Sequence, residues 1–268
     1  MKKALLSIGM AGLMGLTAGA ANAGFVANSF QVNEAIAAGF GTTVTADFIN
    51  GSYTEYFTPT GASTFSTTAV WKGTSMSFNN GTANSLLGGN ESLFGGEIGY
   101  GLYAVFTSTG TFTTSGSVTT LTGTTGSISL YIDKNQNTTF TYGAGGTISY
   151  TLGTTSDDIL IGGTSTLISA VGNVDISSAA AGNFDFIFGD LVLTDPDGLS
   201  YFNGTTIKFA TDIQGNVNDF DPTVSQVFSQ SSANVQLGYY VPEPGSLALL
   251  GLGLAGLGAI QRRKQQAK

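Results

Sequence analysis

Apolar and polar residues alternate at a period of two along much of this 268-residue chain. Because successive side chains of a β-strand point to opposite faces of a sheet, the alternation predicts strands that are buried on one face. The clearest stretches are residues 128–132, 148–152, 184–188 and 235–241. The pattern therefore predicts a domain of many short strands.

Turn signals separate these stretches and predict hairpins. Val44, Ala46 and Phe48 alternate up to Asn50-Gly51, the strongest short hairpin signal, so residues 53–57 are expected to return beside them. The polar turn at residues 134–137 is expected to join residues 128–132 to a returning strand that contains Phe140 and Tyr142. Further turns are predicted at residues 195–198 and 203–204.

Two segments depart from the alternating pattern. We interpret residues 28–40 as a short helix. Residues 107–125 are rich in Thr, Ser and Gly, yet they include Phe112, Val118 and Leu121. An exposed edge hairpin and a disordered segment are therefore both open interpretations of this stretch.

The N-terminus has the three parts of a secretory signal peptide. Lys2 and Lys3 precede an apolar stretch at residues 4–16, and the small residues Ala21 and Ala23 form a cleavage site. We expect the Sec translocon to export the chain and signal peptidase to cut it before Gly24. The body that follows is then fully translocated.

The C-terminus has a different arrangement. Pro242, Glu243 and Pro244 precede an apolar run at residues 245–260. As a helix this run measures about 24 Å, short against a hydrocarbon core of about 30 Å. The two prolines cannot continue the helix and favour an extended segment before it. A basic cluster closes the tail and is expected to stay in the cytoplasm: Arg262, Arg263 and Lys264.

This tail resembles the PEP-CTERM sorting signal. The resemblance implies that exosortase, a membrane-embedded cysteine transpeptidase of exopolysaccharide-producing bacteria, processes the chain. We therefore expect an inner-membrane intermediate, held only transiently by residues 245–260, and then release to the extracellular or cell-surface matrix. A permanent membrane anchor is the alternative interpretation.

Charge and composition narrow the remaining functions. Without the two terminal segments, the body has three lysines against 16 acidic residues, a formal net charge of −13. Nucleic-acid binding is disfavoured because phosphate contacts need clustered Lys and Arg. The chain has no His and no Cys, which excludes a Ser-His-Asp triad, the usual zinc sites and disulfides. We expect no enzymatic activity.

Composition also supports the fold class. The chain has 39 Gly, 18 Phe and 10 Tyr but only 5 Pro, which is typical of an all-β domain with tight turns. We expect a single antiparallel β-sandwich-like domain at residues 24–240. It lies between a signal peptide at residues 1–23 and a sorting signal at residues 241–264.

The body resembles the PepA family of flocculation-associated PEP-CTERM proteins. The resemblance consists of short matches in order along the body, at residues 32–34, 49–55, 99–106, 130–133, 157–158, 184–188, 193–194 and 201–202. It implies a secreted protein that cells need for aggregation in an exopolysaccharide matrix, and it implies no catalytic residue. After Tyr201-Phe202 the chain departs from the family pattern, which expects a segment rich in Pro and Phe.

Oxygen-bearing side chains suggest one cofactor, Ca²⁺. Calcium binds oxygen ligands and needs no His or Cys. Five such side chains lie within ten residues around Gly215, and a solvated acidic loop is the alternative interpretation: Asp212, Asn216, Asn218, Asp219 and Asp221.

Two other sets of acidic residues have ordinary explanations. Asp133, Asn135 and Asn137 begin like an EF-hand loop, but Thr138 and Ala144 stand where that loop needs Gly and Glu. We interpret this run as an Asx-rich hairpin turn. Asp157-Asp158, or Asp185 with Asp190, can act as a glycosidase pair only at a suitable separation in space.

Three functions from different classes remain. The first is a non-enzymatic matrix protein that associates with exopolysaccharide and promotes cell aggregation. The second is a carbohydrate-binding surface module whose candidate aromatic platform is Trp71, Tyr100, Tyr103 and Tyr131, although alternating aromatic side chains in strands often pack inward. The third is a glycan-active hydrolase.

Overall fold

Long antiparallel strands make up most of the described chain. A computed structural model describes residues 24–88, 99–142, 148–151, 157–175, 177, 182–203, 209–216 and 221–241. Residues 25–240 form one compact unit. The strands are β1 (Gly24–Ala27), β2 (Phe30–Asn33), β3 (Thr43–Ala46), β4 (Phe48–Pro59), β5 (Thr64–Phe78), β6 (Gly81–Thr82), β7 (Gly101–Ser115), β8 (Val118–Asp133), β9 (Thr139–Tyr142), β10 (Ile148–Thr151), β11 (Ile159–Thr164), β12 (Thr166–Asp175), β13 (Gly182–Leu193), β14 (Phe209–Asn216) and β15 (Gln226–Val241), and the helices are α1 (Glu34–Ala38) and α2 (Asp197–Tyr201).

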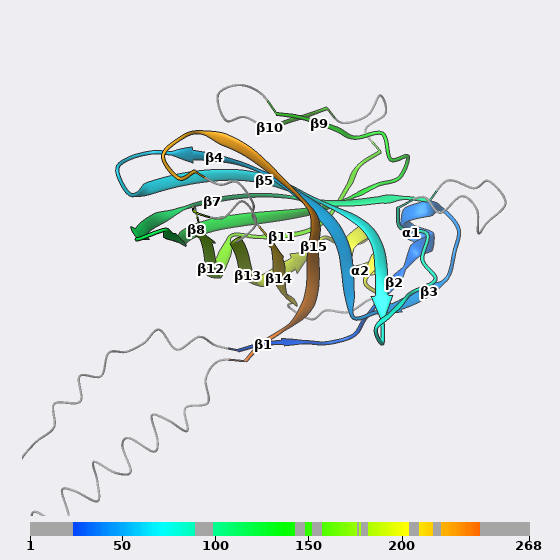
Figure 1. The fold of residues 1–268 in the computed structure, drawn as a ribbon. Helices are drawn as coiled ribbons and strands as arrows, with labels where there is room; N and C mark the ends of the chain where they lie inside the picture. Colours follow the sequence, from blue (N-terminus) through cyan, green and yellow to red (C-terminus); the bar gives the residue numbers. More distant parts are fainter. Residues whose placement is uncertain are drawn as a thin grey trace, which may run out of the picture. The chain divides into compact units, whose positions relative to one another are not determined.

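Among the described residues, eleven strands form one sheet in the order β1-β15-β14-β13-β11-β8-β7-β5-β4, with β12 beside β13 and β8, and β6 beside β5. β15 also pairs with β4, from Gln226 opposite Phe57 to Gln236 opposite Phe48, so the sheet closes on itself. Figure 1 shows β4, β5, β7 and β8 as one layer and β12, β13 and β14 as a second layer beneath it. The all-β antiparallel class is confirmed. The two facing layers are halves of one continuous sheet.

The core lies between these two layers. The predicted alternation of Phe184, Phe186 and Phe188 on β13 is confirmed, because all three side chains are buried. Tyr53 on β4 stacks on Phe106 at 5.2 Å between ring centroids and contacts Phe184 at 4.6 Å. Aromatic rings from both layers therefore fill the interior.

The predicted hairpin at Asn50-Gly51 is wrong. Both residues lie inside β4, where the pairing with β5 has only a bulge. A Cβ atom at Gly51 would lie 2.3 Å from Nε1 of Trp71. Glycine is therefore needed at this position because the Trp71 indole lies against the backbone, and no turn is required.

Two other local predictions need correction. The expected helix at residues 28–40 is strand β2 followed by the short helix α1, which begins where the side chain of Asn33 accepts a hydrogen bond from Ala35 N at 3.2 Å. The turn at residues 134–137 is present, but β9 pairs with β10 and not with β8. Of the turn predicted at residues 195–198, Asp195 and Pro196 form a turn while Asp197 and Gly198 begin α2, and Gly204 lies outside the described residues.

Residues 107–125 belong to the long hairpin of β7 and β8, which turns at Gly116 with a φ of 63°. This hairpin is not at an edge, because β7 pairs with β5 and β8 pairs with β11 and β12. Most of its outward side, with that of β5, is made of Thr and Ser side chains, and we name these positions the hydroxyl face. Its residues are Thr64, Ser66, Thr68, Thr107, Thr109, Thr111, Thr113, Thr120, Thr122, Thr125 and Ser127.

Candidate functional site

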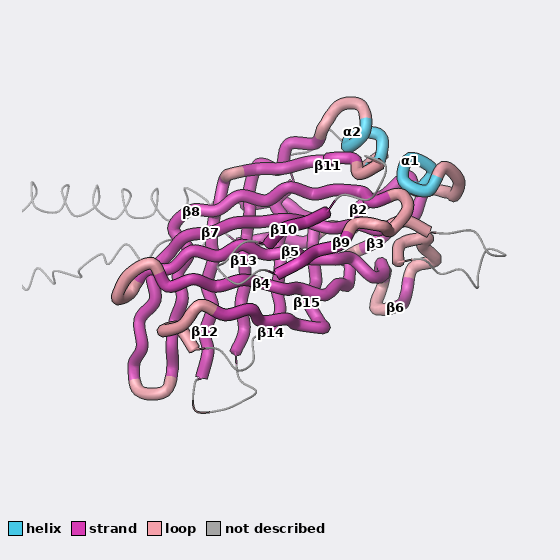
Figure 2. The backbone as a smooth tube through the Cα atoms, turned by 90° about the horizontal axis from the view of Figure 1, so that it is seen from above, coloured by secondary structure: helices cyan, strands magenta, loops and turns pink. Residues whose placement is uncertain are grey.

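A cavity of about 130 Å³ lies at the end of the first layer, where the β8–β9 turn and β9 pack on β5 and β7. We name it the β9 pocket. β9 and β10 form a small separate sheet over this layer (Figures 1 and 2). The pocket is lined by Lys72, Gly73, Gly88, Gly101, Leu102, Tyr103, Asp133, Gln136, Thr138 and Phe140.

Tyr103 and Phe140 line the pocket, and the ring of Tyr131 supports that of Tyr103. Tyr103 on β7 stacks on Tyr131 on β8, with ring centroids 5.0 Å apart and an interplanar angle of 12°. Phe140 on β9 meets Tyr103 edge-on at 5.2 Å. The Nζ atom of Lys72 lies 4.6 Å from the centre of the Phe140 ring, within the range of a cation–π contact. A cationic group and aromatic surface therefore converge on one cavity.

Asp133 also lines the pocket and orders the β8–β9 turn. Its buried carboxylate accepts hydrogen bonds from Asn137 N at 3.2 Å and from Thr138 N at 2.9 Å. The Asx-rich turn expected here is present, but it does not close a hairpin, because β9 pairs with β10. Partial burial lowers the pKa of the Lys72 ammonium, and the Asp133 carboxylate opposes that shift. The pocket thus contains one cationic and one anionic group.

Asp158 holds Tyr103 in place from the side. Its Oδ2 atom accepts hydrogen bonds from the Tyr103 hydroxyl at 2.9 Å and from Thr138 Oγ1 at 2.7 Å. Burial raises the pKa of Asp158 against these hydrogen bonds, and the charges of Asp133 and Asp157 raise it further. The Asp158 carboxylate is therefore committed to positioning the pocket wall.

The structure corrects the expected aromatic platform at three positions. Trp71 and Tyr100 are each 0% exposed and Tyr103 is 3% exposed, so none of them presents an open ring face to a sugar. The Tyr100 hydroxyl lies 2.8 Å from that of Tyr201 and donates to Oε1 of Glu34 at 3.3 Å. Tyr103 and Tyr131 are brought together at the β9 pocket.

The expected calcium ligands are only partly described. Asp212 and Asn216 lie on β14, while Asn218 and Asp219 lie outside the described residues. Oδ1 of Asp221 accepts hydrogen bonds from Thr223 N at 2.9 Å and Thr223 Oγ1 at 2.7 Å, and these bonds lower its pKa. In the described part of the chain, no three carboxylate, His or Cys side chains are arranged to hold a metal ion. The calcium site stays a prediction.

The processing signals lie outside the described residues. This holds for Ala21 and Ala23, for Pro242, Glu243 and Pro244, and for residues 245–264. Within the described ranges, no helix is long and apolar enough to cross a membrane.

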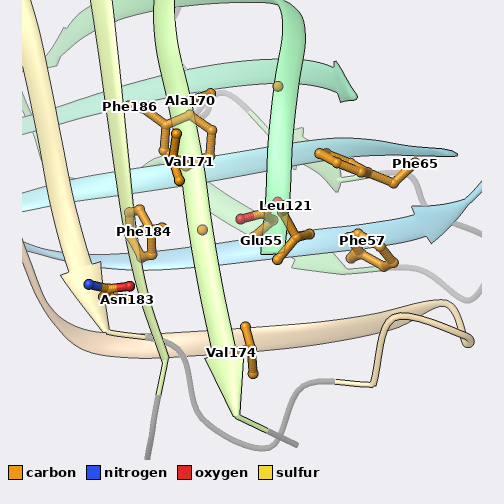
Figure 3. A pocket seen from close by; sticks show the side chains of 12 residues that line it. Glu55, Phe57, Phe65, Leu121, Ala170, Val171, Val174, Asn183, Phe184 and Phe186 are labelled. Atoms are coloured by element: carbon orange, nitrogen blue, oxygen red, sulfur yellow. The ribbon is translucent and has the colours of Figure 1, made fainter. Parts of the chain in front are cut away.

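A second cavity lies inside the closed sheet (Figure 3). It measures about 40 Å³ and is mostly apolar, with the Glu55 carboxyl in its lining beside Phe57, Phe184 and Phe186. The Tyr53 hydroxyl donates a hydrogen bond to Oε2 of Glu55. Burial raises the pKa of Glu55 to about 7, although hydrogen bonds from Tyr53 and Thr67 oppose the shift. This volume admits a few water molecules at most.

Sequence reasoning missed half of the β9 pocket. Lys72 is far along the chain from Gln136 and Phe140, and no motif links it to them. One available signal was the position of Lys72, which is one of three lysines in an acidic body and lies at an outward position of its strand.

Comparison with known proteins identifies one segment of the chain. Residues 241–264 match the PEP-CTERM protein-sorting motif. No curated protein and no solved structure matches the chain. The chain therefore carries a PEP-CTERM sorting motif, which implies export and sorting by exosortase at the membrane, and the match does not extend to residues 24–240.

Proposed function

We propose that this exported PEP-CTERM protein is a non-enzymatic matrix protein that associates with exopolysaccharide and promotes cell aggregation. The observation that supports this best is the β9 pocket, where Tyr103 and Phe140 meet Lys72, Asp133 and Gln136 around one cavity. Aromatic surface beside a few polar groups is the usual composition of a site for a small polar ligand. A sugar offers both an apolar ring face and hydroxyls.

The size of the pocket limits how a polymer partner can bind there. A cavity of about 130 Å³ cannot enclose a polysaccharide, so only a terminal or side group of the chain enters it. The resemblance of the body to flocculation-associated proteins agrees with such a partner. The acidic body adds a second means of association, because Ca²⁺ can bridge it to acidic groups on a glycan.

A carbohydrate-binding surface module is the second candidate, and the partly exposed Tyr131 ring, which stacks on the buried Tyr103, favours it. The two functions differ in what is bound. A module of this kind binds defined oligosaccharides on a glycan array, whereas a matrix protein binds the native polymer and changes cell aggregation when it is removed.

The direct test is binding of the purified body to exopolysaccharide from the producing cells. Lys72→Ala with Gln136→Ala removes two polar groups from the pocket wall, and we expect about tenfold weaker binding. Lys134→Ala is the matched control, because Lys134 is exposed in the same turn and does not line the pocket. Equal binding by the double variant and the control would refute the role of the pocket.

A further inference from the structure

The hydroxyl face forms a regular array. Thr107, Thr109, Thr111 and Thr113 on β7 are all exposed, while the residues between them point into the domain. The pairing continues each row across the layer, so that Thr109 lies between Ser66 on β5 and Thr125 on β8. Neighbouring strands are about 4.8 Å apart, and outward positions repeat at about 6.7 Å along a strand. The result is a two-dimensional lattice of hydroxyl groups.

The hydroxyls of this lattice are held in place but retain bonding capacity. Thr107 Oγ1 lies 3.0 Å from Ser127 Oγ, and Thr109 Oγ1 lies 2.7 Å from Thr125 Oγ1. Each hydroxyl has one donor and two acceptor positions, so a cross-strand pair uses only one donor and one acceptor. Thr side chains are also restricted at χ1. A partner that binds here therefore meets ordered groups, which reduces the entropy cost of association.

The charge of the domain limits which kind of partner can bind the hydroxyl face. The body has a formal net charge of −13, yet every position of the hydroxyl face is Thr or Ser. A cationic partner finds no carboxylate among these Thr and Ser positions, since Asp175 on β12 lies at the end of the face, opposite Val118, and an anionic partner is repelled by the rest of the body. A closed sheet also offers no free edge here for the addition of a strand. An uncharged polymer rich in hydroxyl groups fits these conditions.

The hydroxyl face is continuous with the aromatic wall of the β9 pocket. On the outward side, the cross-strand pair Thr107–Ser127 is followed by the pair Val105–Ser129. The next pair is Tyr103–Tyr131. We propose that an uncharged polysaccharide chain lies along β7 on the hydroxyl face, with one end directed toward the β9 pocket. This inference rests on the proposed function and assigns the class of glycan and the surface that binds its length.

Affinity electrophoresis through gels that contain hydroxyethyl cellulose or dextran, both uncharged, tests this surface. The variant combines Thr107→Val, Thr109→Val and Thr111→Val, which remove three hydroxyls but keep the β-branched shape. We expect wild-type protein to be retarded and the variant to bind about tenfold more weakly. Thr→Ser at the same three positions keeps the hydroxyls and should bind as wild type. Thr166→Val, at an exposed position of β12, is the control for added apolar surface.

The outcomes separate this inference from the proposed function. Retardation that is equal in wild type and in the Val variant would overturn the hydroxyl face as the binding surface. Binding to native exopolysaccharide that depends on Lys72 and Gln136 would then still support the pocket. If neither neutral gel retards the wild type, the proposed class of glycan is wrong. If wild-type protein is a dimer that the Val variant dissociates, the face binds a second copy of the chain and the proposal fails.

Discussion

Trp71 on β5 is joined to β15 by a hydrogen bond, in which its Nε1 atom donates to the carbonyl oxygen of Ala233 at 3.0 Å. The indole is completely buried and lies against Gly51 on β4. Strand β15 also pairs with β4, so one side chain fixes three strands at the place where the sheet closes. This contact depends on the absence of a side chain at residue 51.

Gly51→Ala should therefore destabilise the domain. The new Cβ would lie 2.3 Å from Trp71 Nε1 and 2.4 Å from Lys72 O, so the indole or the backbone must move. We expect a loss of about 1–3 kcal/mol in the free energy of unfolding, measured by urea denaturation. Gly81→Ala is the control, because its Cβ would meet only Phe78 O at 3.5 Å. Equal stability of the two variants would contradict this account of β4.

The same position shows why part of the fold was predictable and part was not. Alternation along β13 and β15 depends on which face is buried, and that information is local, so those strands were predicted correctly. Asn50-Gly51 has the composition of a turn, but its glycine is explained by Trp71, twenty residues away in the chain. Long-range packing of this kind leaves no local signal.

The candidate site shows the same limit. The turn after Asp133 was predictable because its hydrogen bonds join residues four and five positions apart. The β9 pocket was not predictable as a unit, because it forms where β9 leaves the hairpin path and packs over Lys72 and Tyr103. The pairing of β9 with β10 decides that path.

Stability should decrease as pH rises from about 4.5 to about 7. Glu55 has its folded-state pKa raised to about 7 from an ordinary value of 4.5, so the folded protein holds a proton that the unfolded chain releases. The stabilisation is complete below pH 4.5 and is lost as the pH rises through 7. A shift of this size corresponds to about 3 kcal/mol.

Glu55→Gln tests this assignment, because the amide cannot ionise and can still accept the hydrogen bond from Tyr53. In urea denaturation at several pH values, we expect the variant to lose most of the decrease between pH 4.5 and 7. Burial also raises the pKa of Glu34, so a smaller decrease should remain. An unchanged pH profile in the variant would assign the effect to other groups.

Processing should remove both ends of the chain. The cleavage site at Ala21 and Ala23 and the sorting motif at residues 241–264 predict an extracellular protein that begins at Gly24 and lacks Arg262. Intact-mass measurement of the secreted protein checks both ends, and a secreted form that retains Arg262 would contradict the processing scheme. Glu243→Ala should leave the protein at the inner membrane, because it changes the centre of the Pro-Glu-Pro segment. Glu97→Ala, an acidic change in the body, should be released normally.

Calcium should raise the melting temperature if the oxygen-rich segment around Gly215 binds it in the folded state. A ligand that binds only the native state stabilises it by about 2.7 kcal/mol at one hundred times its dissociation constant. Asp219→Asn with Asp221→Asn should abolish the increment. Calcium-free stability should change little, because an Asn at residue 221 can still accept the hydrogen bonds that Asp221 receives from Thr223. Differential scanning calorimetry with and without millimolar CaCl₂ measures both quantities. An equal increment in wild type and double variant would show that calcium acts elsewhere on the acidic body.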